Sequence, residues 1–277
     1  MKAKKGAKSR TRSRKETREN KIANMIKTMT PEYIIDNKDT LDFHELCKIY
    51  PFSEGLAFTL RYKIDWNTLY IYNQTIDKMF FYNNEGFLNW ERISAHKNLP
   101  SIALKRCPDR LDWSQVCRNS QMSEDLMEIL YEYLDYEAIC EYQNLSVGFI
   151  EDHLNDLKLY MTTICDNQVL TQDFMREYKD MVDWSAISRS QRLSESFMEE
   201  MKDYIDWTWA SYKQKMSAHF IETHLENVNL YCLMKKDAYI PKAIQRTPQY
   251  EICKLYMSKG YDIFDVEDIT TKELEAG

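Results

Sequence analysis

Large aromatic side chains return along this chain about every 24 residues, each with similar polar and apolar companions. These positions, which we call anchors, are Phe43, Trp66, Trp90, Trp113, Tyr136, Tyr160, Trp184, Trp207 and Tyr231. An Asp or Asn precedes many anchors, and an apolar or small residue follows three positions later. Near the middle of the interval, an apolar residue comes directly before a capping residue such as Ser or Thr. An internal repeat of this length is typical of stacked repeats rather than of one closed core.

The repeat that starts at Asp183 shows the pattern clearly. Asp183, directly before the anchor, can accept the free amides of a short helix that runs to about Gln191. Ser194 can cap a second helix in the same way, and Leu193 before it can pack onto Met198. Both helices fall below the ~12–15 residues that an isolated helix needs, so they depend on packing against neighbouring repeats.

The sequence therefore predicts an all-α fold: an α-solenoid of short two-helix repeats, with capping helices and a disordered basic N-terminal arm. We divide it into the arm (1–21), an N-terminal cap (22–42), the repeat array (43–231), and a C-terminal cap with an acidic tail (232–277). Thr30 before Pro31 predicts a helix start within the N-terminal cap. Six Gly and six Pro are too few for a turn-rich β protein.

Charge is distributed unevenly along the chain. Residues 1–21 hold ten Lys or Arg against Glu16 and Glu19, a net charge of +8. Subtracting these from the totals of 37 and 44 leaves 27 basic and 42 acidic residues, a net charge of −15. The basic residues of interest in the arm are Lys4, Lys5, Lys8, Arg10, Arg12, Arg14 and Lys15. They are typical of an arm that binds nucleic acid or directs nuclear import, and equally of a solubilising tail.

The aromatic anchors have two interpretations. Exposed aromatic rings can stack on nucleic-acid bases, as in RNA-binding repeats. Here each ring keeps a fixed place beside a helix cap and an apolar residue, which favours packing in the core.

The remaining residues point away from catalysis. None of the seven cysteines has the C-x-x-C spacing of a zinc or redox motif, and the odd count suggests free thiols in a reducing compartment. Cys47, Cys117 and Cys140 share the fourth position after an anchor, where Ser occurs in other repeats, so a small residue is expected there. His153 and His224 occupy the same position of two different repeats, so the repeat explains them better than a role as metal ligands does. No glycine-rich phosphate loop occurs, and we expect no cofactor, no metal and no enzymatic activity.

No apolar run approaches the length of a membrane-spanning helix, and no apolar signal segment stands at the N-terminus. We therefore expect an intracellular protein without a membrane partner.

The pattern D-W-x-x-I-S-x-x-Q-x-L-S-x-x-F resembles the short helical repeats of many uncharacterised proteins of giant DNA viruses and large phages. The matching residues are Asp183, Trp184, Ile187, Ser188, Gln191, Leu193, Ser194, Phe197 and Met198, with a second match between Asp206 and Ile221. The likeness covers roughly residues 43–231 and loosens where Tyr or Phe replaces Trp. It implies a repeat scaffold in a viral setting, in the host cytoplasm, the host nucleus or the virion, and it provides no active site to transfer.

The expected function is a non-enzymatic scaffold that binds a host or viral protein. The acidic body favours a basic partner, and no small-molecule substrate is expected. The alternative is a protein associated with RNA or DNA that uses the basic arm to contact phosphates.

Overall fold

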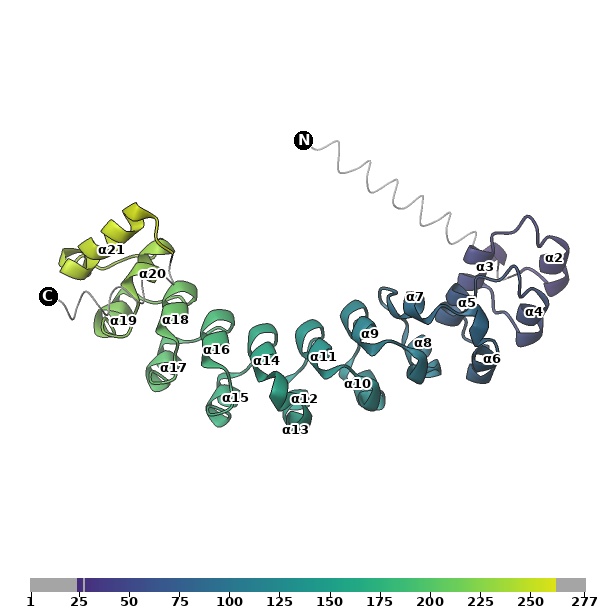
Figure 1. Ribbon diagram of the computed structural model, residues 1–277, viewed down its shortest axis with the longest axis horizontal. Coiled ribbons are helices and arrows are strands. Elements are labelled where there is room, and N and C mark those ends of the chain that lie inside the picture. Colours follow the sequence, from purple (N-terminus) through teal and green to yellow (C-terminus); the bar gives the residue numbers. More distant parts are fainter. Residues whose placement is uncertain (1–23, 27, 263–277) are drawn as a thin grey trace. The chain divides into compact units, whose positions relative to one another are not determined.

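The computed structural model describes residues 24–262 except Lys27, and every regular element among these residues is a helix (Figure 1). The predicted all-α fold is therefore confirmed. Contacts divide the chain into an N-terminal unit, Met1–Asp135, and a C-terminal unit, Tyr136–Gly277. The predicted basic arm lies outside the described residues.

The described helices of the N-terminal unit come in pairs, a first helix of five to seven residues and a second helix of six. The pairs are α3 (Phe43–Ile49) with α4 (Glu54–Thr59), α5 (Trp66–Tyr72) with α6 (Lys78–Asn83), α7 (Trp90–Ser94) with α8 (Ser101–Arg106), and α9 (Trp113–Asn119) with α10 (Glu124–Ile129). Helix α2 (Pro31–Asp36) precedes them, and Thr30 caps it by accepting the backbone N–H of Tyr33, as predicted. The short 3-10 turns are η1 (Glu85–Phe87), η2 (Pro108–Arg110) and η3 (Tyr131–Tyr133).

The C-terminal unit continues the alternation of first and second helices. Its pairs are α11 (Tyr136–Tyr142) with α12 (Val147–Asp152), α14 (Met161–Asn167) with α15 (Gln172–Glu177), α16 (Trp184–Ser190) with α17 (Glu195–Glu200), and α18 (Trp207–Lys213) with α19 (Ala218–Thr223). Helix α13 (Leu154–Leu157) and η4 (Lys158–Tyr160) lie between the first two pairs. Helix α20 (Leu230–Lys235), η5 (Ile244–Arg246) and α21 (Pro248–Lys259) follow α19. Neighbouring first helices from α11 to α20 lie side by side, and α21 packs on α20 (Figure 1).

Side-chain caps start most of these helices where the sequence predicted them. First helices are capped by Asp42, Asp65, Asn89, Asp112, Asp183, Asp206 and Asn229, whose side chains each accept a backbone N–H of the first turn. Second helices are capped in the same way by Ser53, Asp77, Ser146, Thr171, Ser194 and Ser217. Each cap satisfies donors that a helix start otherwise leaves unpaired, a contribution of roughly 1 kcal/mol.

The tryptophan anchors pack partly in the core and also make a directed hydrogen bond. Trp66 and Trp113 are buried, while Trp184 and Trp207 are half-buried. In each of these four side chains the indole N–H donates to the carbonyl oxygen five positions earlier, at 2.8 to 3.0 Å. The deepest positions are instead the residue three after the anchor and the apolar pair of the second helix, as at Ile187, Phe197 and Met198. The indole therefore ties the start of a first helix to the segment that leads into it.

Two anchors are displaced by one residue from the predicted register. We placed them at Tyr160 and Tyr231, but the helices begin at Met161 and Leu230. No acid precedes Met161, and the extra turns α13 and η4 lengthen that repeat. Asn229 caps the other helix by accepting the N–H of Cys232, which fixes its start at Leu230 and leaves Tyr231 in the second position.

Glutamine side chains join helix pairs of the C-terminal unit to the pair before them. Gln191 donates from Nε2 to the carbonyl oxygens of Cys165 and Gln168, both at 2.7 Å, and its Oε1 accepts the N–H of Leu170 at 3.0 Å. Gln168 and Gln214 make the same three bonds to their own preceding pairs. All three glutamine residues are buried, so these bonds satisfy groups that water reaches poorly. We call this arrangement the glutamine clamp.

In the N-terminal unit, Arg106 makes an equivalent connection from a different place in the repeat. Its guanidinium, at the end of α8, donates to the carbonyl oxygens of Tyr70 and Asn73. These are the fourth and seventh residues after the start of α5, the same two positions that the glutamine clamp uses. Arg106 is only 7% exposed and lies over the ring of Phe81 at 4.8 Å.

The small residue four positions after a helix start receives a hydrogen bond from the next pair. The hydroxyls of Ser94, Ser188 and Ser211 accept the N–H groups of Asp112, Asp206 and Asn229 at 2.8 to 3.1 Å. At the same position, the backbone N–H groups of Asp65, Asp135 and Asp183 act to lower the thiol pKa of Cys47, Cys117 and Cys165, against the stronger effect of burial. The interchange of Ser and Cys in the sequence thus keeps a small side chain that faces a backbone N–H of the next pair.

Replacing Gln191 with Ala should lower the free energy of unfolding by at least about 3 kcal/mol, because three buried backbone groups lose their partner at about 1–3 kcal/mol each. Urea denaturation followed by circular dichroism measures the loss. The control is Gln74→Ala at an exposed glutamine, for which a change within about 0.5 kcal/mol is expected. A loss below about 1 kcal/mol for Gln191→Ala would show that the clamp is not a main source of stability.

Candidate binding pocket

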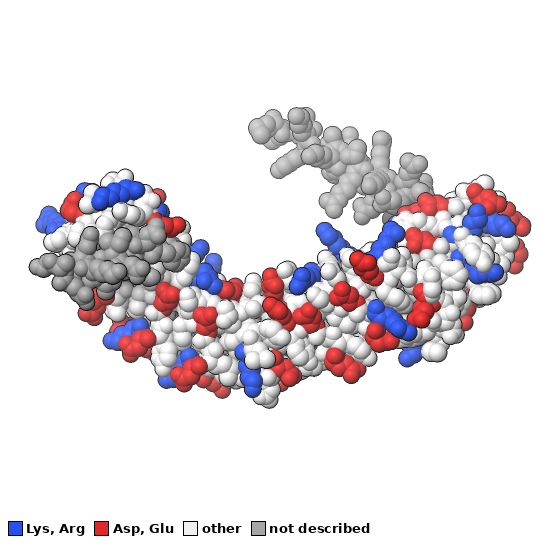
Figure 2. All heavy atoms as spheres, viewed as in Figure 1, with Lys and Arg blue, Asp and Glu red and all other residues white. Residues whose placement is uncertain are grey.

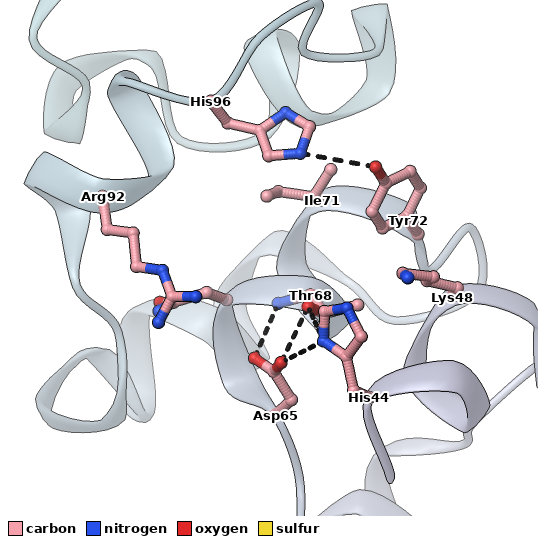
Figure 3. Close-up of a pocket in the computed structure, with 9 residues that line it drawn as sticks. His44, Lys48, Asp65, Thr68, Ile71, Tyr72, Arg92 and His96 are labelled. Atoms are coloured by element: carbon pink, nitrogen blue, oxygen red, sulfur yellow. Dashed lines mark hydrogen bonds and ion pairs between the residues drawn. The ribbon is translucent and has the colours of Figure 1, made fainter. Parts of the chain in front are cut away.

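A polar pocket of about 210 Å³ opens on the N-terminal unit across α3, α5 and α7 (Figure 3). Its lining residues are His44, Lys48, Asp65, Asn67, Thr68, Ile71, Tyr72, Arg92 and His96. In Figure 3 the side chains of Lys48 and Arg92 lie on opposite sides of Thr68, and His96 lies beyond Ile71. The pocket therefore combines side chains from three consecutive helix pairs.

The repeat determines which residues face this pocket. Apart from Asp65, every lining residue lies one, two, five or six positions after the start of its first helix. At about 3.6 residues per turn these positions share one face, opposite the positions that pack and form the clamps. We call this face of the first helices the first-helix surface; most of its pocket residues are at least partly exposed, whereas Thr68 and Ile71 are buried.

Asp65, His44 and Thr68 form a hydrogen-bonded group at one edge of the pocket. Oδ2 of Asp65 lies 2.6 Å from His44 Nδ1 and accepts the hydroxyl of Thr68 at 2.9 Å. Its Oδ1 accepts the backbone N–H of Thr68, which makes Asp65 the cap of α5. Partial burial acts to raise the pKa of Asp65, but the bonds from His44 and Thr68 outweigh it, and the net pKa lies below its ordinary value.

This group lacks the geometry of a nucleophilic triad. In such a triad one ring nitrogen of His takes the proton of the nucleophile while the other bonds the carboxylate. Here the Thr68 hydroxyl, at 3.2 Å, and the Asp65 carboxylate both approach Nδ1 of His44. The hydroxyl also donates to Asp65, so no separate base activates it. The arrangement serves to hold His44 and the helix start in place.

The cationic side chains of the pocket can receive an acidic group. Lys48 pairs with Glu45 at 2.8 Å, a contact exposed to solvent, and Arg92 is exposed and makes no ion pair with any described residue. His96 Nε2 lies 3.4 Å from the Tyr72 hydroxyl, and its Nδ1 is buried without a hydrogen-bond partner among the described residues. Since the oxygens of Asp65 are already bonded, the free donors suit a carboxylate or phosphate oxygen from outside the chain.

The residues singled out in the sequence lie elsewhere. Lys4, Lys5, Lys8, Arg10, Arg12, Arg14 and Lys15 fall outside the described residues. Of the anchors, Trp66, Trp90, Trp113, Tyr136, Trp184 and Trp207 each begin a first helix, while Tyr160 and Tyr231 lie one residue away from such a start. None of these anchors lines the pocket.

The cysteines and histidines of the repeat have structural surroundings. All seven cysteines are free and buried. Burial raises the pKa of the Cys47 and Cys140 thiols to about 12, so both are protonated at neutral pH and poor nucleophiles. His224 stacks on Phe220 and bonds Glu199.

Within the described residues, no three His, Cys, Asp or Glu side chains lie close enough together to hold a metal ion. No helix of this part of the chain is both long and apolar enough to cross a membrane.

The pocket residues were not predicted as a site from the sequence. His44 and Arg92 lie two repeats apart in the sequence, and nothing groups them until first helices are known to be adjacent. The available signal was that the first and third of these repeats each carry one histidine and one basic residue at outward positions, His44 with Lys48 and Arg92 with His96.

Comparisons with protein-family models, with curated proteins and with solved structures give no match to this chain. Its function is therefore inferred from the residues and geometry described above.

Replacing Asp65 with Asn should reduce the dependence of stability on pH in acid. The pKa of Asp65 in the folded chain is lowered from an ordinary 3.8, so its carboxylate contributes stability above that value and loses it as pH falls through the folded pKa. Asn still caps the helix but does not titrate. Urea midpoints at about pH 6 and about pH 3 should therefore differ less for Asp65→Asn than for the parent chain. An equal difference in both proteins would contradict this prediction.

Proposed function

We propose that this chain is a non-enzymatic α-solenoid scaffold that binds another protein through its first-helix surface. The observation that carries the proposal is the separation between repeating and variable positions. Repeating positions are occupied by caps, packing residues and clamps between pairs, as at Asp183, Ile187 and Gln191. The outward positions serve neither as caps nor as clamps, and their residue types differ from one repeat to the next, as at His44, Ser185 and Glu137. Repeat proteins that bind partners use this combination of a fixed frame and a variable surface.

The chemistry of the first-helix surface changes from one part of the chain to another. In the N-terminal unit it carries the His, Lys and Arg side chains of the pocket. In the C-terminal unit, α11 presents Glu137 and Glu141, while α18 presents Trp209, Tyr212 and Lys213. On the face shown in Figure 2, acidic side chains are spread widely with basic ones among them. A surface this varied supports recognition of an extended macromolecule better than of one small molecule.

The lack of catalytic geometry at the pocket also supports a binding role. Thr68 and Asp65 both approach the same ring nitrogen of His44, and burial raises the pKa of the cysteine thiol at Cys47. The net charge of −15 outside residues 1–21 favours a basic partner or a basic stretch of one. Following the viral resemblance of the repeat, we infer a host or viral protein as partner, met inside the host cell or the virion.

Charge reversal on the first-helix surface tests the proposal. The variant Arg92→Glu with Glu141→Arg changes one exposed outward residue in each unit. Its matched control, Lys105→Glu with Glu177→Arg, makes the same exchange on exposed positions of the second helices α8 and α15. Each full-length protein is used for affinity capture with nuclease present. A partner that stays with the parent and the control, and binds the first variant at least about tenfold more weakly, a loss of about 1.4 kcal/mol, supports the proposal. Equal retention by both variants, or loss of every partner after nuclease treatment, contradicts it.

The second candidate function is association with RNA or DNA. The observation that favours it is the net charge of +8 within residues 1–21, set against an acidic remainder. Such an arm gains affinity by neutralising phosphates, and that affinity falls steeply with salt concentration.

Deleting residues 1–21 separates the two candidate functions. If the arm contacts phosphates, the deletion should abolish salt-dependent retention of a fluorescent single-stranded RNA or duplex DNA, measured by fluorescence anisotropy. Capture of the nuclease-resistant protein partner should be unchanged by the deletion. Retention of nucleic acid without the arm would assign that binding to the helical body and remove the arm from the mechanism.

A further inference from the structure

A second pocket, of about 370 Å³, lies in the C-terminal unit where α18 and α20 end. Its lining residues are Lys213, Gln214, Lys215, Met216, Leu233, Lys236, Ala238 and Tyr239. The helices α18 and α20 lie side by side, so the pocket spans the last junction between first helices in the described chain (Figure 1). We call it the lysine pocket.

Three ammonium groups in the lysine pocket have no acidic partner among the residues that the structure describes. Lys213, Lys215 and Lys236 make no ion pair with a described residue, and no carboxylate lines the pocket. Lys236 donates from Nζ to the Gln214 carbonyl oxygen at 2.5 Å, and burial lowers its pKa. Lys236 thus donates to the carbonyl oxygen that the glutamine of a further helix pair would otherwise bond. Three like charges around one cavity attract an acidic group and repel a basic one.

The floor of the lysine pocket is apolar. Leu233 is fully buried beneath it, Met216 is half-buried, and the ring of Tyr239 is 67% exposed at its edge. An exposed aromatic ring beside a buried aliphatic floor favours contact with apolar side chains. The pocket is therefore complementary to a peptide that has both acidic and apolar residues.

The chain itself supplies such a peptide directly after its last described residue. Residues 263–277 contain five acids and one lysine, a net charge of −4. Most of its apolar side chains stand among the first three of these acids, in Ile263-Phe264-Asp265-Val266-Glu267-Asp268-Ile269. This composition matches both the ammonium groups and the floor of the lysine pocket.

The point where this segment begins is held close to the pocket. The Tyr261 carbonyl oxygen accepts the Tyr231 hydroxyl at 2.6 Å and Lys235 Nζ at 3.1 Å. Both donors belong to α20, and Lys236 of the pocket is the next residue after Lys235. An extended chain advances about 3.3 Å per residue, so about five residues beyond Asp262 span roughly 16 Å, longer than this short helix.

We propose that residues 263–277 of this chain dock in its own lysine pocket, with acidic side chains on Lys213 and Lys215 and apolar side chains on the floor. The segment would then shield the end of the first-helix surface from an acidic partner. This inference does not depend on which partner the scaffold binds, because both the pocket and its occupant belong to the chain.

Zero-length carbodiimide cross-linking of the full chain, analysed by mass spectrometry, tests this docking. The reagent joins a lysine amine to a carboxylate in direct contact, with loss of water. Amide bonds from Lys213 or Lys215 to Asp265, Glu267 or Asp268 should form in at least about fivefold greater yield than bonds from Lys242 or Lys259. The latter are exposed lysines of the same unit outside the pocket. Equal yields from the two sets of lysines would mean that the cross-links arise only because the segment is covalently attached to the chain. That result would overturn the proposal.

Two further measurements keep the test specific. Replacing Phe264 and Val266 with Ser keeps every carboxylate but removes apolar contacts, and should reduce the pocket cross-links several-fold. The matched variant Leu274→Ser, in the same segment, should leave them unchanged. The third sample is a mixture of nitrogen-15-labelled and unlabelled chains. Pocket cross-links that join a labelled to an unlabelled peptide as often as random pairing of chains predicts would assign the pocket to a second copy and overturn docking within one chain.

Discussion

A side chain from the following helix pair supplies hydrogen bonds that the ends of the short first helices α5, α11, α14 and α16 lack. Such short helices leave a large share of their carbonyls unpaired, and they do not persist alone. Gln168, Gln191 and Gln214 close these ends in the C-terminal unit, and Arg106 does so in the N-terminal unit. The hydroxyls of Ser94, Ser188 and Ser211, four positions after a helix start, bond the next pair as well. A helix pair therefore needs a neighbouring pair both to bury its apolar side chains and to complete its hydrogen bonds.

Much of the local structure follows from the sequence, because caps are encoded by single residues. Asp183 and Ser194 predict the starts of α16 and α17 correctly. The register was wrong where ring size was given more weight than capping. At Tyr231 the ring marked the anchor, although Asn229 fixes the helix start one residue earlier. The role of Gln191 was missed for another reason, since spacing shows that a helix ends there but not what the amide contacts.

The pocket on α3, α5 and α7 was less accessible to prediction. Its residues occupy variable positions, and what unites them is the adjacency of first helices that belong to successive repeats. The sequence identified the repeats to which His44 and Arg92 belong, but not that their side chains line the same pocket. It also drew attention to the aromatic rings, which mainly serve packing and the hydrogen bond of the indole. Recognition therefore has to be sought among residues that the repeat leaves unspecified.

The clamp also gives the chain a direction. The pairs that begin with α14 and α16 donate through their clamp glutamine to the pair before, and their own carbonyl oxygens accept from the clamp of the pair that follows, so each of these pairs has a donating side and an accepting side. A duplicated stretch of one whole repeat would bring both sides with it and would fit between existing pairs without leaving a polar group unmatched. At the last junction of the C-terminal unit a different residue serves, and there Lys236 bonds the carbonyl oxygen of Gln214. Length in this architecture can thus change by whole repeats during evolution, while its two ends must be kept.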